Sequence, residues 1–414
     1  MAKFSLKKII TVPARKILGQ KRYNKLKNTV RRGRNYIRRN LLKVKSFFYC
    51  KTKLQPRVVF HSFVGKQYSD NSKAVSERLH EVAPEVEIVW FFLDVDKFKG
   101  VVPEYVKCVE ATPKNLLYYY STSKVWADNC TSEPMINNLY KSKKQTYIHF
   151  WHGDRGFKKC FFDLPGWKSK FLISKKGFCD YMTTGSVHAE RVYTSMFRYK
   201  NPFLKVGCPR NDMLINEDAN QRKEIRSKLG LDDETKLLIY APTFRRRFKK
   251  KGMDISGIDL DNVIAQLEKT YGCKWVCGIR GHHEIGSLVR EENNSKVIDL
   301  TSYPDMADLM LAGDMLITDY SSCAGDFALT HRPVILFIQD LEEYTTKDRT
   351  LLFDIDKSPY IYAETNEQLI DIIKNIKKVD IKKNCDDILE FYETYETGKA
   401  TDEVVKIMLE ALKK

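Results

Sequence analysis

Between residues 57 and 338 the chain alternates short apolar runs with stretches whose apolar residues recur at helical spacing. The runs are rich in Val, Ile, Leu and aromatic residues, which predicts buried β-strands. The expected strands are 57–63, 86–93, 106–110, 124–130, 145–151, 237–243, 274–280, 296–300, 315–319 and 334–338. The expected helices are 69–82, 222–229, 260–271, 304–312 and 323–330.

Helical patterns between strands indicate βαβ units and parallel sheets. The polar segment 216–236 separates two series of strands and is expected to be a linker. We therefore predict an α/β protein with two Rossmann-like domains, 54–215 and 237–380, that face a cleft. Residues 381–414 are expected to be a helical segment that packs back on one or both domains. Ligands of open α/β sheets bind outside the carboxyl ends of the strands, so the cleft is the expected site.

Residues 1–53 differ from the rest of the chain in charge. They hold 18 of the 71 Lys and Arg residues and no acid, so the net charge of +18 belongs to this segment. Apolar residues recur among the charges, which predicts one or two basic amphipathic helices, interrupted at Pro13 and Gly33. Such helices bind anionic membrane surfaces, which are the expected partner. Nucleic acid, which we do not expect as a partner, and a solvated tail are the alternatives.

The sequence also predicts where in the cell the protein is located. It contains neither an apolar run of about 18 residues that would span a bilayer nor the apolar stretch of a signal peptide. The ten cysteines are scattered without C-x-x-C spacing, which is typical of reduced thiols in a cytosolic protein. We expect a cytoplasmic protein that is peripheral on the inner face of the cell membrane.

The first candidate for chemistry is His152, which follows a predicted strand and precedes Gly153. A histidine at a strand's carboxyl end would lie in the cleft, where it can act as a general base near neutral pH. Lys158 and Lys159 are close enough in sequence to share a site that attracts phosphate. The alternative is a turn whose histidine only caps the strand.

A second strand, 274–280, ends in Arg280 and is followed by His282 and His283. Two histidines, one from each domain, would have different roles in the cleft. One takes a proton from an attacking hydroxyl, and the other stabilises phosphate charge. His283 would point the other way if the strand continued, so we expect it to be a bystander.

Two further segments follow predicted strands. Ser321 and Ser322 precede a helical pattern, and a helix start with free N–H groups and hydroxyls is suited to phosphate. An ordinary capped helix is the alternative. Arg245–Arg247 would suit an anionic ligand, although a solvated basic run explains the same residues. The sequence contains no P-loop, dinucleotide-binding or His-Glu-x-x-His motif.

Seven segments in order resemble the CDP-glycerol glycerophosphotransferase family, which includes the teichoic acid primases and polymerases. They spread over roughly residues 57 to 360 and are Gly65–Asn71, Trp151–Gly153, Gly207–Asp212, Tyr240–Thr243, Arg280–His282, Ile317–Ser322 and Asp340–Tyr344. The resemblance implies a fold of two Rossmann-like domains that is GT-B-like, with the acceptor on the N-terminal domain and the CDP-polyol on the C-terminal one. It implies transfer of glycerol phosphate from CDP-glycerol to a hydroxyl, with release of CMP.

The resemblance also implies roles for single residues. His152 is similar to the family's catalytic base, and His282 resembles its second active-site histidine. The residues implied at the donor are Thr243, Arg280, Asp319, Ser321, Ser322 and Arg349. Those implied at the acceptor or a secondary site are Lys66, Asp70, Asn71, Lys158, Arg210 and Asn211. No metal and no other cofactor is expected, because basic side chains can neutralise the phosphates.

The expected acceptor is a lipid-linked glycan or a growing polyol-phosphate chain, in teichoic acid or capsular polymer synthesis. Asp154-Arg155 stands where many relatives have Thr-Pro, and Lys357–Tyr360 stands where many have Pro-Gly-Pro. Both departures are expected to affect the acceptor or polyol pocket. The alternatives are the same transfer from CDP-ribitol or another CDP-polyol, a nucleotide-sugar glycosyltransferase on the same fold, and a non-enzymatic membrane scaffold.

Overall fold

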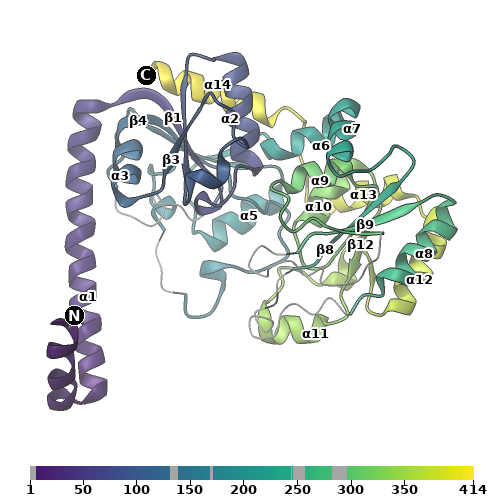
Figure 1. Ribbon diagram of the computed structural model, residues 1–414, viewed down its shortest axis with the longest axis horizontal. Coiled ribbons are helices and arrows are strands. Elements are labelled where there is room, and N and C mark those ends of the chain that lie inside the picture. The colour runs from purple at the N-terminus through teal and green to yellow at the C-terminus, as the bar shows by residue number, and fades with distance from the viewer. Residues whose placement is uncertain (1–5, 131–138, 168–170, 244, 246–256, 282–295) are drawn as a thin grey trace, which may run out of the picture.

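The computed structural model describes residues 6–130, 139–167, 171–243, 245, 257–281 and 296–414. Within these residues, each half of the chain forms one parallel β-sheet with helices packed on both faces. The helix α1 (Leu6–Lys53) extends away from the first half (Figure 1).

The sheet of the first half has the strand order β3-β2-β1-β4-β5-β6-β7. Its strands are β1 (Gln55–His61), β2 (Glu87–Phe92), β3 (Val106–Glu110), β4 (Ser123–Asp128), β5 (Thr146–His149), β6 (Tyr181–Thr184) and β7 (Phe203–Lys205). The helices α2 (Asp70–Val82) and α14 (Ala400–Lys413) share a core with one face of the sheet. The helices α3 (Pro113–Thr122) and α5 (Val187–Met196) pack on the other face.

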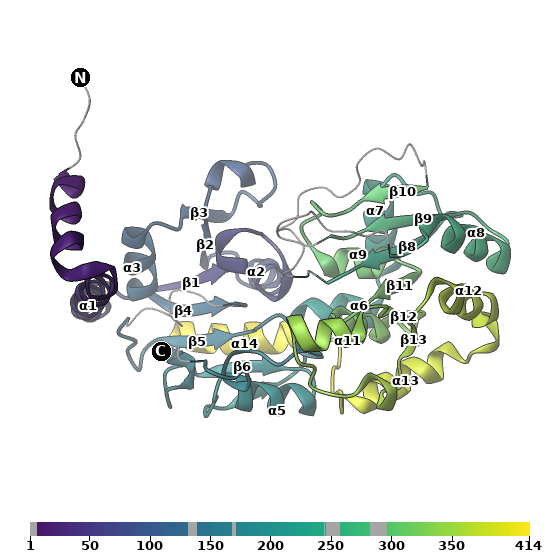
Figure 2. The same ribbon diagram turned by 90° about the horizontal axis from the view of Figure 1, so that it is seen from below.

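The sheet of the second half has the order β10-β9-β8-β11-β12-β13. Its strands are β8 (Lys236–Ala241), β9 (Trp275–Ile279), β10 (Val297–Asp299), β11 (Met315–Thr318), β12 (Val334–Phe337) and β13 (Ile361–Ala363). One face is covered by α8 (Leu260–Tyr271) and α12 (Asn366–Asn375) (Figure 2). The other face packs against α6 (Asp212–Asn216), α7 (Ala219–Lys228), α9 (Met306–Ala312), α10 (Cys323–Phe327) and α13 (Ile381–Phe391).

All ten strands predicted from apolar runs are present, and the five predicted helices correspond to α2, α7, α8, α9 and α10. The sequence patterns missed β6, β7 and β13, which have only four, three and three residues.

The end of the chain crosses between the two halves. Helix α13 buries Cys385 and Ile388 against the second half, whereas α14 buries Val404 and Met408 against the first. In Figures 1 and 2 the yellow C-terminal helix α14 accordingly lies beside the first sheet. The C-terminal segment therefore ties the two halves together.

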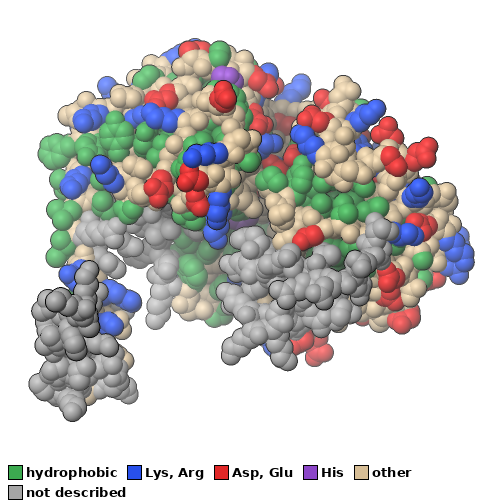
Figure 3. Space-filling view, viewed as in Figure 1, with side chains coloured by type: hydrophobic (Ala, Val, Ile, Leu, Met, Phe, Trp, Pro, Cys, Tyr) green, Lys and Arg blue, Asp and Glu red, His purple; other side chains and the backbone are tan. Residues whose placement is uncertain are grey.

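The long helix α1 is interrupted at Gly19, whose φ of 68° and ψ of 149° are not helical. The predicted interruptions at Pro13 and Gly33 were wrong, since both residues lie within helical backbone. Glycine adopts a positive φ without a steric penalty, which explains why the break occurs there. Hydrophobic side chains line the outer edge of the upper part of α1 in Figure 3. Within the described residues, no helix combines the length and the apolarity needed to cross a bilayer.

Both sheets contain the strand order of the dinucleotide-binding folds, in which the direction of winding reverses next to the first strand. The reversal falls between β1 and β4 in the first half and between β8 and β11 in the second. Loops that leave the carboxyl ends of these strands diverge there and create a crevice. The fold therefore marks one place in each half where a ligand is expected.

Candidate functional site

A cavity of about 460 Å³ lies between the two sheets, and we call it the cleft. The first half contributes residues that follow β1 and β5, and the second half contributes residues that follow β8, β9 and β11. The residues named from the sequence that line it are Asp70, His152, Lys158, Arg210, Thr243, Arg280, Ser321 and Ser322. Residues far apart in the chain thus share one cavity at the ends of both sheets.

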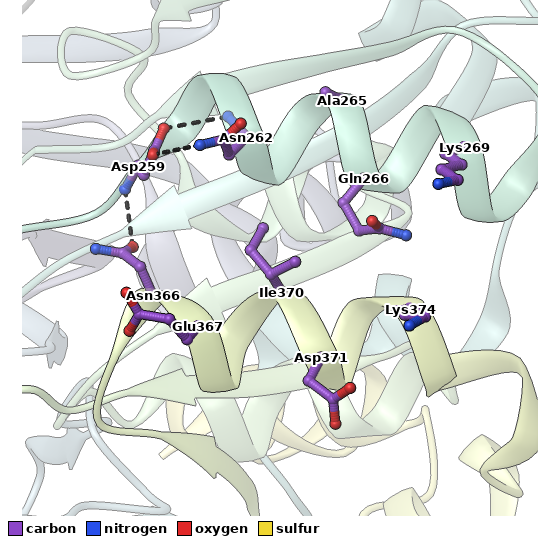
Figure 4. Close-up of a pocket in the computed structure, with 10 residues that line it drawn as sticks. All are labelled: Asp259, Asn262, Ala265, Gln266, Lys269, Asn366, Glu367, Ile370, Asp371 and Lys374. Atoms are coloured by element: carbon purple, nitrogen blue, oxygen red, sulfur yellow. Dashed lines mark hydrogen bonds between the residues drawn. The ribbon is translucent and has the colours of Figure 1, made fainter.

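Another cavity, of about 550 Å³, lies between α8 and α12 on the outer side of the second sheet (Figure 4). Its walls are the polar sides of two helices, held together where the Asp259 amide donates to Asn366 Oδ1 at 2.9 Å. None of the residues named from the sequence lines this cavity. We therefore assign the chemistry to the cleft.

His152 is the titratable group best placed for proton transfer in the cleft. Its Nδ1 lies 2.7 Å from the carbonyl oxygen of Asn129. A carbonyl only accepts hydrogen bonds, so Nδ1 carries the proton and Nε2 is left with a lone pair. Burial lowers the pKa of His152 below its ordinary value of 6.5, so the ring is neutral at pH 7. This is the protonation state that a general base requires.

The loops that carry these groups in the first half contain strained backbone. Phe63, Val64, Asp70 and Trp151 have φ values of 42°, 59°, 67° and 54°, in the left-handed region. Residues other than glycine adopt this backbone region at a cost of about 1–3 kcal/mol, and such residues cluster at functional sites. The loops after β1 and β5 are therefore held in conformations that local preference alone would not select.

Thr243 and Asp319 lie side by side in the second half, where the chain leaves β8 and β11. The amide of Thr243 donates to Asp319 Oδ1 and Oδ2 at 2.9 and 3.0 Å, and Arg245 Nη2 donates to Oδ2 at 2.8 Å. Asp319 is only 4% exposed and does not line the cleft. Its carboxylate thus positions the Thr243 loop rather than facing a ligand.

The basic triplet Arg245–Arg247 does not present three free charges. Arg245 is buried, pairs with Asp319 and Asp340, and lies over the rings of Tyr320 and Tyr344 at 5.0 and 4.5 Å. Arg246 and Arg247 lie outside the described residues. The expectation that Arg245 meets an anionic ligand was therefore wrong, because two carboxylates already occupy its guanidinium.

Ser321 and Ser322 both line the cleft at the start of α10. A Cβ placed on Gly153 would lie 3.5 Å from Ser322 Oγ, so this hydroxyl faces the residue after His152. Helix α10 has only five residues before it tightens into a 3₁₀ turn, and its dipole is correspondingly small. An anion bound here would depend on the hydroxyls and on the cations of the cleft.

Three basic side chains lie in or beside the cleft. Lys158 lines the cleft, and burial lowers its pKa below the ordinary value. Arg349 is half-buried nearby, because residues 350–352 pair with residues 157–159 through the Lys158–Leu351 bridge. Arg280 lines the cleft and donates to the carbonyl oxygen of Leu300 at 3.1 Å. Their combined positive charge suits a diphosphate.

A buried ion-pair network joins the halves behind the cleft. Asp326 of α10 accepts from Arg155 at 2.7 Å and from Arg210 at 2.8 Å. Arg210 also pairs with Asp70 at 2.7 Å, and Arg155 pairs with Glu396 at 2.8 Å. Burial raises the pKa of Asp326, but the two arginines outweigh it and bring the pKa below the ordinary value. Every charge in this network has a partner.

The network changes the interpretation of several predicted residues. Asn71 Nδ2 donates to the Trp151 carbonyl at 3.1 Å, and Asn211 Nδ2 donates to Glu396 at 2.8 Å, so both amides support the site from behind. Lys66 is exposed and does not line the cleft. The second predicted histidine, His282, lies outside the described residues.

The departure at Asp154-Arg155 has a structural explanation. Asp154 accepts from the Gly185 amide at 2.8 Å and the Ser186 hydroxyl at 2.7 Å, and Arg155 belongs to the network. Both side chains are buried and neither lines the cleft. The expectation that they affect the acceptor or polyol pocket stays a prediction, and such an effect would act through Asp326, which pairs with Arg155 and lines the cleft.

The sequence patterns missed Asn129, Asp305, Asp326 and Glu396. Asn129 fixes the His152 ring, Asp305 lines the cleft, and Asp326 and Glu396 belong to the network. An acid at the start of the predicted helix 304–312 was a signal for Asp305, but the same residue is also explained as an N-cap.

Among the described residues, no three His, Cys, Asp or Glu side chains gather as metal ligands would. The metal-free site stays a prediction.

Sequence comparison identifies relatives over most of the chain. The model of the family described as CDP-Glycerol:Poly(glycerophosphate) glycerophosphotransferase matches residues 43–410. The teichoic acid poly(glycerol phosphate) polymerase of Bacillus subtilis (strain 168) is 30% identical over 86% of this chain and 48% of its own length. The teichoic acid glycerol-phosphate transferase of Staphylococcus aureus (strain NCTC 8325 / PS 47) is 30% identical over 77% of this chain and 83% of its own.

Structure comparison agrees with the sequence. The wall teichoic acid polymerase TagF superposes with a TM-score of 0.75 at 28% identity, over 94% of this chain and 98% of that chain. The chain spans about half the length of the first two curated polymerases it matches, at 48% and 54%. The family match covers both sheets and every described residue of the cleft. The chain therefore belongs to the CDP-glycerol:poly(glycerophosphate) glycerophosphotransferase family.

Proposed function

We propose that this chain transfers glycerol phosphate from CDP-glycerol to a hydroxyl of a lipid-linked or polymeric acceptor, with release of CMP. Family membership supports the proposal, as do relatives named for glycerol-phosphate polymerisation and transfer. The product would be a teichoic acid or a capsular polymer. The contents of the cleft support the same chemistry, since it combines a neutral histidine with hydroxyls and cations.

In the proposed reaction, His152 Nε2 takes the proton of the acceptor hydroxyl while its oxygen bonds to the phosphorus nearest the polyol. The bond from that phosphorus to the bridging oxygen breaks, and CMP leaves with the electron pair. Negative charge develops on the transferring group and on CMP. Ser321, Ser322 and the cations Lys158, Arg280 and Arg349 would stabilise it. His282 is proposed as the second active-site histidine.

One observation carries the proposal: the start of α10 meets the His152 loop. The 3.5 Å approach of Ser322 Oγ to a Cβ built on Gly153 brings the proposed phosphate site next to the proposed base. Both contribute to the wall of one cavity, although they are about 170 residues apart in the sequence. A base and an electrophile must come within about 3–3.5 Å of the reacting hydroxyl, and this geometry suits that need.

We infer a GT-B-like arrangement, with residues 54–215 on the acceptor side, 216–236 as the linker and 237–380 as the donor-binding domain. The location of His152 in the first half and of Ser321, Ser322 and Arg280 in the second supports this division. The donor remains open to a second candidate. Relatives named as a ribitol-phosphate polymerase and a ribitol-phosphate primase, both from Bacillus spizizenii (strain ATCC 23059 / NRRL B-14472 / W23), are 26% identical.

We also propose that α1 binds an anionic membrane surface. Leu26, Val30, Ile37, Leu41, Val44 and Phe48 are 52–60% exposed, and their spacing puts them on one side of a helix. The opposite side packs on the body through Ser46, which donates to the Tyr140 carbonyl at 3.0 Å, and through the buried Cys50. An apolar stripe that points away from its own core, on a segment with 18 basic residues and no acid, suits the lipid interface.

A location follows from these proposals. Nucleotide-activated donors are made in the cytoplasm, and all ten cysteines are free thiols, which suits a reducing compartment. We therefore propose a peripheral enzyme on the cytoplasmic face of the cell membrane. Anionic lipid, rather than nucleic acid, is the proposed partner of α1, because the exposed stripe of this helix is apolar.

The test is CMP release by the purified chain from CDP-glycerol, CDP-ribitol and UDP-sugars, with and without a lipid-linked or polyol-phosphate acceptor. We expect acceptor-dependent CMP release from a CDP-polyol. Turnover of a UDP-sugar alone would instead support a glycosyltransferase. Absence of turnover with every donor and acceptor would support the scaffold and overturn the proposal.

A further inference from the structure

Asp305 differs from the other buried carboxylates at the cleft. Asp70 pairs with Arg210, and Asp326 pairs with Arg155 and Arg210. Asp305 is 6% exposed, and among the described residues it accepts hydrogen bonds only from backbone amides. The Asp70 amide donates to Oδ2 and the Ala307 amide donates to Oδ1, both at 3.1 Å.

Burial of a carboxylate without an ion-pair partner costs several kcal/mol in a protein. Burial, together with the negative charges of Asp308 and Asp70, outweighs the attraction of Lys73 and raises the pKa of Asp305 to about 6. A helix N-cap alone would not need this charge, since Ser or Thr caps a helix as well. Carboxylates kept in such environments concentrate at functional sites.

The position of Asp305 indicates what it meets. It caps α9 in the second half, and the amide it accepts from belongs to Asp70 of the first half, at a residue with a φ of 67°. Asp305 lines the cleft together with Gln67 and His152. Each carboxylate oxygen has a second lone pair beyond its amide bond, so the group can still accept hydrogen bonds.

Two cations attract the Asp305 carboxylate: Arg280 of the cleft and Lys73 of α2. Among the described residues neither forms an ion pair with it, since Lys73 pairs with Glu77 and Arg280 donates to the carbonyl of Leu300. Lys158 is close to Asp319 and Arg349, and Ser322 lies against Gly153. A carboxylate repels phosphate, so a phosphate is not its ligand. Hydroxyl groups donate hydrogen bonds, and carboxylate and amide side chains are the groups that accept them.

We propose that Asp305 binds a hydroxyl of a polyol in the cleft. The inference rests on the proposed function and extends it, because it assigns a residue to recognition of the polyol rather than of the nucleotide or the phosphates. The polyol belongs either to the donor or to the end of the acceptor, and both present the same chemistry. Recognition through a carboxylate would also reject a substrate that lacks the hydroxyl.

The experiment compares Asp305→Ser, which keeps an N-cap oxygen, and Asp305→Asn with the wild-type chain. Asp308→Asn is the matched control. Asp308 lies on the same helix and accepts from the Tyr303 hydroxyl at 3.2 Å, but it lines the smaller cavity beside α2 and not the cleft. Calorimetry gives the affinities for CMP and CDP-glycerol, and CMP release gives the KM of a polyol-phosphate acceptor.

A lost hydrogen bond to a charged group corresponds to about a 10- to 100-fold change. If the donor polyol is bound, both Asp305 variants should lose CDP-glycerol affinity by this factor and keep their affinity for CMP. If the acceptor polyol is bound, its KM should rise by this factor with donor affinity unchanged. Asp308→Asn should change neither quantity.

Unchanged affinity and KM in a folded Asp305→Ser variant would overturn the inference and leave the proposed function intact. Equal loss of CMP and CDP-glycerol affinity would overturn it too, because that result means a structural cap. Failure of the wild-type chain to release CMP from any CDP-polyol would instead overturn the proposed function and the inference with it.

Discussion

The two halves of the molecule build the same contact at the reversal of their strand order. In the first half, Asn129 follows β4, and its Oδ1 accepts from the amide of Phe63 in the loop after β1, at 3.0 Å. In the second half, Asp319 follows β11, and its carboxylate accepts from the amide of Thr243 after β8, at 2.9 Å. Each polar side chain fixes the neighbouring loop at the edge of the cleft.

The halves differ in the residues that follow the next strand of each sheet, β5 in the first half and β12 in the second. After β5 comes His152, a neutral ring whose Nδ1 donates to the Asn129 carbonyl. After β12 comes Asp340, which pairs with Arg245 and holds it on Asp319. One half therefore presents a neutral histidine to the cleft, and the other presents the hydroxyls of Ser321 and Ser322 together with Arg280. The fold provides equivalent positions, and the residues placed there decide the chemistry.

The comparison depends on the two halves being held together, and Asp326→Ala tests this. The change leaves Arg155 and Arg210 buried without a shared carboxylate. We expect a loss of about 3–5 kcal/mol in the free energy of unfolding, measured by urea denaturation. Asp386→Ala, which removes exposed pairs with His331 and Lys382, should cost about 1 kcal/mol or less. Equal effects would show that the network does not hold the halves.

Lys158→Met sharpens the assignment of the phosphate site. Loss of this charge from the cleft should weaken CDP-glycerol binding about 10- to 100-fold, measured by calorimetry. Lys159→Met is the matched control, because the next side chain lines a different cavity beside α5. Donor affinity that falls equally in both variants would mean that only the overall charge matters.

The pH profile separates the base from the cations. His152 must be deprotonated to act, so kcat/KM should rise with pH and level off above the pKa of the free enzyme's base. Burial lowers that pKa, so the plateau should begin below about pH 6.5. The rise of kcat/KM with pH should persist in Asp305→Ser, even though the pKa of Asp305 lies near 6. If the midpoint of the rise in kcat/KM lay above pH 7, the base would be another group.

The smallest effect on catalysis is expected from α1. Deletion of residues 1–40 spares Leu42, Ser46, Tyr49 and Cys50, which pack on the first half. Turnover on a short soluble acceptor should change less than about twofold, because no cleft residue is removed. Co-sedimentation with anionic vesicles should be lost, and binding by the full chain should weaken as salt rises.

A matched variant tests whether the stripe or the charge binds the vesicles. Replacing Leu26, Val30, Ile37 and Leu41 with Gln keeps every basic residue of α1. Binding should then fall at all salt concentrations, because the apolar contribution is gone. If the truncated chain still pellets as well as the full chain, the membrane contact lies elsewhere.

Much of the fold and part of the site followed from local patterns. Apolar runs located ten of the thirteen strands of the described residues, and strand ends pointed to His152, Arg280 and Ser322. These residues line the cleft because parallel strands end at one edge of a sheet. The periodicity of side chains is a property of neighbours in the sequence, so it could be read without the structure.

The remainder depends on contacts between distant segments. Arg155 pairs with Glu396 across 241 residues, and Arg210 pairs with Asp326 across 116. No spacing rule connects such partners, so the sequence did not reveal that these arginines pair with distant carboxylates. Asp305 had the sequence of an ordinary N-cap, and only its burial at the cleft, without an ion pair among the described residues, distinguishes it.

The central claim is that the first half supplies the base and the second half binds the donor. His152→Ala tests it most directly, with CMP release and CDP-glycerol affinity measured on the same preparation. We expect turnover to fall by about 100-fold or more while donor affinity stays within about twofold of the wild type. His331→Asn, at an exposed histidine with a φ of 51°, is the control and should retain both. Normal turnover in a folded His152→Ala protein would contradict the account.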